Sequence, residues 1–143
     1  MLQPSTIAAL NRLLAIVGRS FPQYLQYSRP YIPPGCENVV ETIASIAADQ
    51  NVLADRISQM LVDAEAPIRS GEFPMEFTDM HDLGIDFLVN MGIAYQEQDI
   101  GAIGQLVEQL PGAPAAKALA EEALGMAKGH LESLRELTPA AVK

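Results

Sequence analysis

Residues 46–60, IAADQNVLADRISQM, carry the clearest helical pattern in this chain of 143 residues. Around them, apolar and uncharged side chains recur in alternating steps of four and three, the spacing of one face of an α-helix. The pattern predicts a helix over about 37–64 with one face buried against other helices. Gln50 lies in the middle of that face, and we expect neighbouring helices to supply its partners, because an unpaired buried amide costs about 1–3 kcal/mol. The stripe consists of Val39, Ile43, Ile46, Gln50, Leu53, Ile57, Met60 and Ala64.

The composition limits the classes of protein to which the chain can belong. Its length is that of one domain, so we expect a single domain over 1–143 with a core that needs no disulfides. The one cysteine, Cys36, excludes an internal disulfide and a cysteine-based zinc site. A net charge of −9 argues against binding to nucleic acid or to an anionic membrane. The sequence contains no secretory or membrane-spanning run, and a cytoplasmic protein is expected.

The first predicted helix, over about 5–28, is apolar on more than one face. Ser5 is a suitable N-cap. Pro22 should kink the helix between 18 and 21, since proline removes a backbone donor. Between residues 7 and 25 only Arg12 and Arg19 are charged. A helix that is apolar on two sides is usually covered on two sides, so we expect a homodimer that pairs through this helix and the helix over 37–64.

The connection over 65–77, EAPIRSGEFPMEF, is too long for a tight helix hairpin. When extended it can span about 40 Å, which is close to the length of the helix before it. This length favours an all-α four-helix bundle with a long crossover between the second and third helices. Thr78 is a suitable cap for a third helix over about 78–110, and a fourth is expected over about 114–138, ending before Thr138 and Pro139. Glycines are unfavourable inside helices, so we expect close helix approach at Gly92, Gly101, Gly104, Gly125 and Gly129.

Polar side chains occupy the centres of the predicted stripes. Gln96 has the same central place in the third helix that Gln50 has in the second, and His130 lies on the inner stripe of the fourth. Tyr24 lies on the core stripe of the first. Because buried polar groups are hydrogen-bonded, these four residues predict a polar cluster in the middle of the bundle.

Short segments on three of the helices resemble bacterioferritin. In the first helix, Leu10-Asn11, Gln23-Tyr24 and Arg29 are similar to the opening helix of that family. The segment 53–57, LADRI, resembles the residues after the family's first Glu-x-x-His ligand pair, and 127–131, AKGHL, resembles the second pair. The resemblance implies a ferritin-like fold over nearly the whole chain, a topology that includes a long crossover.

Most of the iron ligands that this family uses are replaced here. Its di-iron site takes a carboxylate from each of the first and third helices and a Glu-x-x-His pair from each of the second and fourth. The family's haem-binding methionine would lie where the chain has Asn51 and Val52. At the positions that correspond to the di-iron ligands, the chain keeps His130 and otherwise has Val17, Gln50, Leu53, Gln96 and Ala127.

Neutral side chains cannot offset the charge of two ferrous ions. We therefore expect a ferritin-like protein with no di-iron centre, no cofactor and no catalytic residue, which acts as a dimeric interaction or small-ligand-binding module. Within the polar cluster, His130 is expected to hydrogen-bond to Gln50 or Gln96. A mononuclear metal site at His130 is the alternative.

Two other interpretations remain open from the sequence. Rotation of a helix could turn acids beside the stripes inward and rebuild a site for iron or another divalent metal from His130, Asp49, Asp86 and Glu97. His81, among aspartates near the start of the third helix, is a further metal candidate, although a solvated helix start explains it more simply. The small residues near the centre could instead leave a cavity for a small apolar ligand.

Overall fold

The computed structural model describes residues 2–80 and 84–142, and in these ranges it contains helices and no strands. The prediction of an all-α fold is confirmed. Within the same ranges, no helix is long and apolar enough to cross a membrane. The elements are α1 (Pro4–Gly18), α2 (Phe21–Ser28), α3 (Glu37–Asp63), the 3-10 helix η1 (Met75–Met80), α4 (Ile85–Glu108) and α5 (Pro114–Val142).

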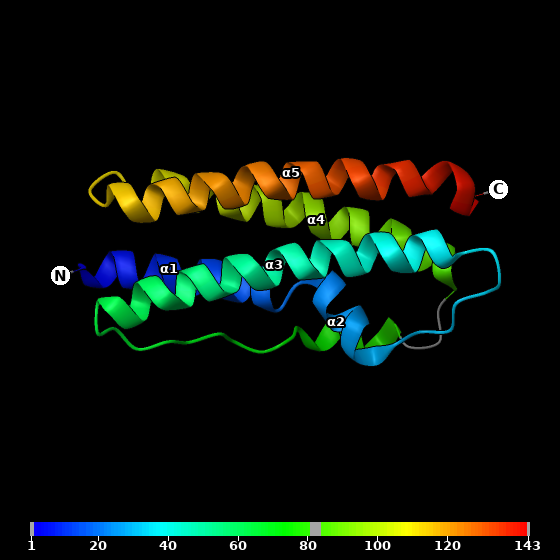
Figure 1. The fold of residues 1–143 in the computed structure, drawn as a ribbon, viewed down its shortest axis with the longest axis horizontal. Coiled ribbons are helices and arrows are strands. Elements are labelled where there is room, and N and C mark those ends of the chain that lie inside the picture. The colour runs from blue at the N-terminus through cyan, green and yellow to red at the C-terminus, as the bar shows by residue number, and fades with distance from the viewer. Residues whose placement is uncertain (1, 81–83, 143) are drawn as a thin grey trace.

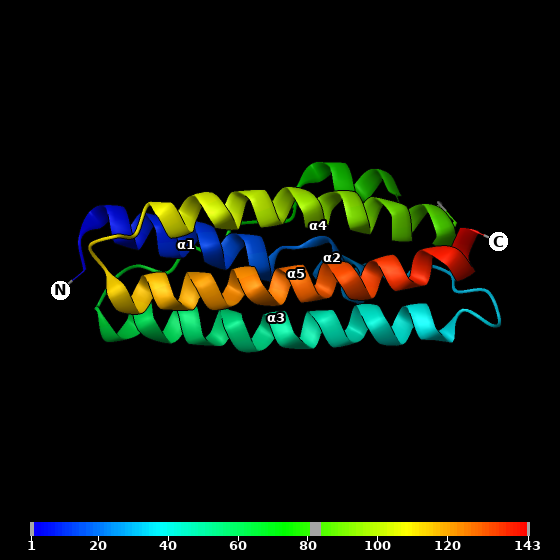
Figure 2. The same ribbon diagram turned by 90° about the horizontal axis from the view of Figure 1, so that it is seen from above.

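The helices lie side by side along one long axis (Figures 1 and 2). α1 and α2 follow one another in a single row, and α3 runs back from the far end toward the start of α1. The chain after α3 returns along the length of α1 before η1, so that α4 runs in the same direction as α3. α5 then runs back beside α4, and the start of α1 and the end of α5 lie at opposite ends of the molecule.

The prediction of a single helix over 5–28 is wrong, because the structure has two helices there, α1 and α2, with a break between them. Arg19 leaves the helical region with φ −121°, and Ser20 then begins α2 as its N-cap, with its Oγ accepting a hydrogen bond of 3.4 Å from the Gln23 N–H. Pro22 lies in the first turn of α2, where its missing N–H has no helical partner to lose. The predicted kink is therefore a complete break that starts a new helix.

The second apolar side of α1 is covered by the connection between α3 and η1, residues 64–74, which we call the strap. Asn11 holds the strap with two hydrogen bonds, from its Nδ2 to Pro67 O (3.0 Å) and from the Arg69 N–H to its Oδ1 (2.6 Å). A Cβ atom at Gly71, which has φ +73°, would lie 3.2 Å from Ala15 Cβ, so the strap approaches α1 closely. Within α1, every residue of which is described, no large apolar side chain is exposed. The two-sided apolar pattern thus no longer supports a subunit interface at α1, and the homodimer stays a prediction.

The third and fourth helices have other limits than those expected. Thr78 is not the cap of α4, because it lies in η1 and its Oγ1 donates to Met75 O at 2.6 Å. α4 begins at Ile85 after Gly84, and the metal candidate His81 lies outside the described residues. α5 continues past Pro139 to Val142. A proline in a helix removes one backbone hydrogen bond and crowds the carbonyl four residues before it, here that of Arg135, and nothing in the structure explains why α5 continues past Pro139.

The apolar core consists of two clusters that follow one another along the bundle. On α3, Leu53 belongs to the cluster near the start of α1, and Ile46 belongs to the cluster around α2. The same division occurs on α5 between Ala127 and Leu134. Gln50, Gln96 and His130 lie between the two clusters along their helices.

The glycines of α4 and α5 do not mark close helix contacts. A Cβ atom added at Gly101, Gly104, Gly125 or Gly129 would have no heavy atom of a neighbouring element within 4 Å, and one at Gly92 would meet only the Phe21 ring at 3.8 Å. The expected compensation for their low helix propensity is therefore absent from the described part of the chain.

Candidate functional site at the centre of the bundle

One small cavity lies in the middle of the bundle. All six positions that the resemblance aligns with di-iron ligands line it, although they come from α1, α3, α4 and α5. Its volume is about 10 Å³, which is room for about one water molecule. An organic ligand needs far more space, so the cavity does not support the idea of an apolar ligand at the centre. The six residues are Val17, Gln50, Leu53, Gln96, Ala127 and His130.

The side chain of Gln50 is buried in α3 and is bonded to the break between α1 and α2. Its Oε1 accepts a hydrogen bond of 2.6 Å from Ser20 Oγ. Ser20 is itself buried and is the N-cap of α2. Gln23, in the first turn of α2, adds a hydrogen bond from its Nε2 to Ala47 O at 2.8 Å. The start of α2 is therefore attached to α3 by two amide side chains.

Gln96 joins α4 to α5. It is 2% exposed, and its Nε2 donates a hydrogen bond of 3.0 Å to the carbonyl oxygen of Ala127. Ala127 stands at a position where the resemblance to bacterioferritin would place a glutamate. Here its backbone carbonyl accepts the hydrogen bond from α4. The amide of Gln96 thus serves as a helix-to-helix link.

His130 pairs with an acid and not with either glutamine as expected. Its Nε2 lies 2.9 Å from Asp49 Oδ2, so a protonated Nε2 donates to the carboxylate and links α5 to α3. The His130 side chain is 11% exposed and that of Asp49 is 51% exposed, which places the pair at the rim of the core. Water reaches the carboxylate there and screens its charge.

Tyr24 does not belong to this polar centre. It is buried, but its ring packs among aromatic residues of the other core cluster, 5.4 Å from the Phe73 ring and 5.5 Å from the Phe77 ring between centroids. Tyr24 also makes a polar or ring contact beyond these two. Of the four residues expected in the cluster, Gln50, Gln96 and His130 share the cavity.

Asp99 is the residue of the site that the sequence reasoning missed. It lines the central cavity and also a second cavity of about 230 Å³ between α1, α4 and the chain around the strap and η1. Burial raises its pKa from 3.8 to about 7, and the nearby charge of Arg12 opposes this shift in part. Asp99 follows Gln96 by three residues, so the helical spacing that singled out Gln96 could have found it.

The residues present do not fit a di-iron centre. At the cavity the chain offers one imidazole, one carboxyl group and two amides, and both amides, through Gln50 Oε1 and Gln96 Nε2, are hydrogen-bonded within the chain. Two ferrous ions would need several more anionic oxygens. Among the side chains that the structure describes, in residues 2–78 and 84–137, no group of three or more His, Cys, Asp or Glu could hold a metal ion.

The alternative ligand set is only half assembled. Asp49 meets His130, but the Glu97 carboxylate lies 3.5 Å from the Arg135 guanidinium and is 54% exposed. Asp86 is an exposed residue in the first turn of α4, ten residues and about 15 Å along the helix from Gln96. The geometry therefore brings together two of these four residues.

Comparison with known proteins adds no relative: no family model, no curated protein and no solved structure matches the chain.

Proposed function

We propose that this chain is a ferritin-like protein in which a closed polar core has replaced the di-iron site, and that it acts by binding and not by redox catalysis. The observation that supports this proposal is the central cavity. The six positions that resemblance aligns with iron ligands surround one space of about 10 Å³, and five of them hold uncharged side chains.

The path of the chain supports the ferritin-like part of the proposal. In that topology a long crossover separates two helix pairs. Here the strap returns along α1, and α3 and α4 consequently run in the same direction (Figure 1). A simple up-and-down bundle with short loops would place these two helices antiparallel.

The hydrogen bonds support the non-catalytic part. Gln50 and Gln96 use their amides to hold α2 against α3 and α4 against α5. A cluster of metal-free carboxylates at the same positions would repel one another, and burying them would cost free energy. Neutral residues avoid both penalties, so the core can close without a metal.

Iron binding tests this proposal directly. We expect the purified protein to contain less than stoichiometric metal by elemental analysis. An anaerobic titration with ferrous iron should show no saturable binding, and admitting oxygen should consume it no faster than in protein-free buffer. Ferrous iron should also leave the melting temperature unchanged, because a ligand of the folded state would raise it.

A variant with restored ligands is the matched comparison. It carries Val17→Glu, Gln50→Glu, Leu53→His, Gln96→Glu and Ala127→Glu, which returns the donor set of the family. We expect this variant to gain ferrous iron binding and to be less stable than the wild type without metal. Saturable binding of two irons by the wild type, with protein-dependent oxygen consumption, would overturn the proposal, and this measurement decides even if the variant fails to fold.

A further inference from the structure

A third cavity, distinct from the two that Asp99 lines, has the size and lining of a ligand site. It lies where the end of α2 meets the start of α3 and the start of α4, and its volume is about 330 Å³. Ligand pockets in proteins have volumes of about 300–1,000 Å³. Its walls are aliphatic, with Leu25, Ile43 and Ile85 forming the buried part and Val40, which is 40% exposed, lying toward solvent.

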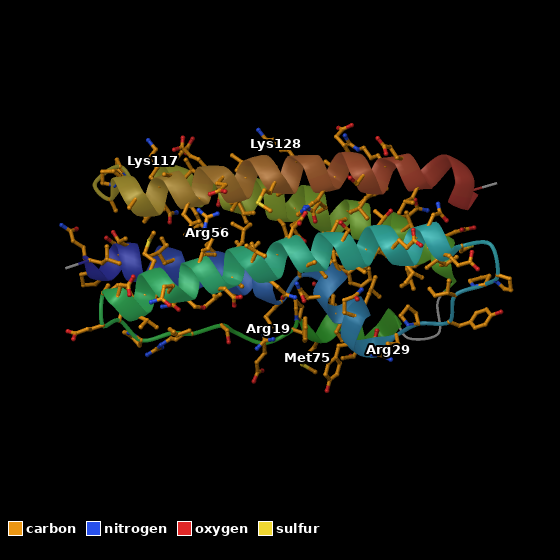
Figure 3. The ribbon with its side chains drawn as sticks, viewed as in Figure 1. Arg19, Arg29, Arg56, Met75, Lys117 and Lys128 are labelled. Carbon is orange, nitrogen blue, oxygen red and sulfur yellow. The ribbon has the colours of Figure 1, made fainter. Side chains whose placement is uncertain are left out.

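Arg29 supplies the only charged side chain among the described residues that line this cavity. It ends α2 in the left-handed region, with φ 49° and ψ 72°, and its N–H bonds to Leu25 O. A residue other than glycine in this region is strained, and such strain is often retained where it positions a functional group. Figure 3 shows Arg29 at the edge of the molecule where α2 ends.

The guanidinium of Arg29 has no partner among residues 2–78 and 84–137, whose side chains the structure describes. Arg56 and Arg135, by contrast, have acidic partners: Arg56 pairs with Glu122 at 2.7 Å, and Arg135 lies 3.5 Å from Glu97. Arg29 makes neither an ion pair nor a side-chain hydrogen bond in the described part of the chain. An unpaired cation beside an aliphatic pocket is complementary to a molecule with an apolar tail and one negative charge.

We propose that this cavity binds a free aliphatic carboxylate of medium chain length. The tail lies against Leu25, Ile43 and Ile85, and the carboxylate accepts hydrogen bonds from Arg29, with Gln26 as a second polar group at the cavity. This proposal names a ligand class for the binding role suggested above. It concerns other residues than the polar core, so failure to bind carboxylates would not make the protein an iron enzyme, and iron binding would not fill this cavity.

Calorimetric titration with decanoate below its micelle concentration tests the proposal. We expect saturable binding of one decanoate per chain and weaker binding of decanol, which has the same tail without the charge. Arg29→Asn should weaken decanoate binding by about tenfold or more, because a hydrogen bond to a charged group is lost. Asparagine tolerates the left-handed backbone, so this variant should fold.

Two matched pairs of variants separate the site from general surface effects. Arg69→Asn removes another exposed arginine, on the strap, and should leave binding unchanged. Val40→Glu puts a negative charge at the cavity and should abolish binding. Its control is Val52→Glu, which changes a residue of α3 that is 59% exposed and does not line the cavity, and which should bind decanoate as the wild type does. No saturable binding to the wild type, or equal losses in Arg29→Asn and Arg69→Asn, would overturn the proposal.

Discussion

Ser20 Oγ donates a hydrogen bond of 2.6 Å to Gln50 Oε1, and this contact joins the break between α1 and α2 to the middle of α3. The same hydroxyl oxygen accepts from the Gln23 N–H as the N-cap of α2. One buried side chain therefore starts a helix and satisfies a core amide. Removal of this hydroxyl should affect both.

Ser20→Ala should lower the free energy of unfolding by about 2 kcal/mol, because α2 loses its N-cap and the buried Gln50 Oε1 loses its hydrogen-bond donor. Urea unfolding followed by circular dichroism measures the change. Ser45→Ala on the exposed face of α3 is the control, and it should change stability by less than about 0.5 kcal/mol. Equal effects of the two substitutions would contradict the assigned role of Ser20.

Asn11→Ala should release the strap from α1. The amide makes two hydrogen bonds to the strap backbone, at Pro67 O and at the Arg69 N–H, and alanine makes neither. We expect a loss of about 1–2 kcal/mol in the free energy of unfolding and faster trypsin cleavage after Arg69, because the strap opens locally more often. Asn38→Ala, an exposed residue of α3, should leave the cleavage rate unchanged. If both variants are cut at the wild-type rate, other contacts hold the strap.

The helical pattern predicted those features of the fold that depend on local sequence. α3 agrees with the helix expected over 37–64 to within one residue, because its stripe is regular for its whole length. The sequence predicts a kink between 18 and 21, where the structure has a break, because Pro22 fits both a kinked helix and the first turn of a new one. Thr78 has a side chain that can cap a helix, but it lies inside η1, where its hydroxyl donates to Met75 O.

The site could be predicted only where it follows from helix faces. Gln50, Gln96 and His130 share a cavity. The sequence could predict this because the stripe on each helix indicates which residues face the core and how far along the helix they lie. Tyr24 is buried as its stripe indicates, but it lies in α2, beyond the break after α1, and belongs to the other core cluster. The pairing of His130 with Asp49 depends on the rotation of α3 and α5 against each other, which one sequence does not fix.

The homodimer stays a prediction, and we now expect it to form through a different surface. Tyr27 and Met75 are 81% and 85% exposed, and the Tyr27 ring lies 6.4 Å from that of Phe73. Met75 lies on the same edge of the molecule as Arg19 and Arg29 (Figure 3). We expect light scattering to give twice the 15.4-kDa chain mass, and Tyr27→Glu with Met75→Glu to give monomers. Val62→Glu, on α3, should stay dimeric, and a wild type that is monomeric at all concentrations would refute the dimer.

Asp99 should make the stability of the protein fall as the pH rises. Its pKa is about 7 in the folded chain and near 3.8 when unfolded, so between these values the folded state binds more protons than the unfolded state. By linkage, the free energy of unfolding then decreases from about pH 4 to pH 7, and the loss is complete above pH 7. The opposing charge is that of Arg12, and Arg19, Glu72 and Glu76 line the same cavity.

Asp99→Asn removes this titration and keeps the shape of the side chain. The variant should be more stable than the wild type at pH 8, on the order of 2 kcal/mol after allowing for the partial exposure of the carboxyl group. The advantage should shrink as the pH falls toward 4 and disappear at lower pH, where the wild-type carboxyl is protonated in both states. Urea unfolding of both proteins at several pH values gives this difference, and the other titrating groups cancel because both chains contain them. A difference that does not vary with pH would show that Asp99 is solvated in the folded protein.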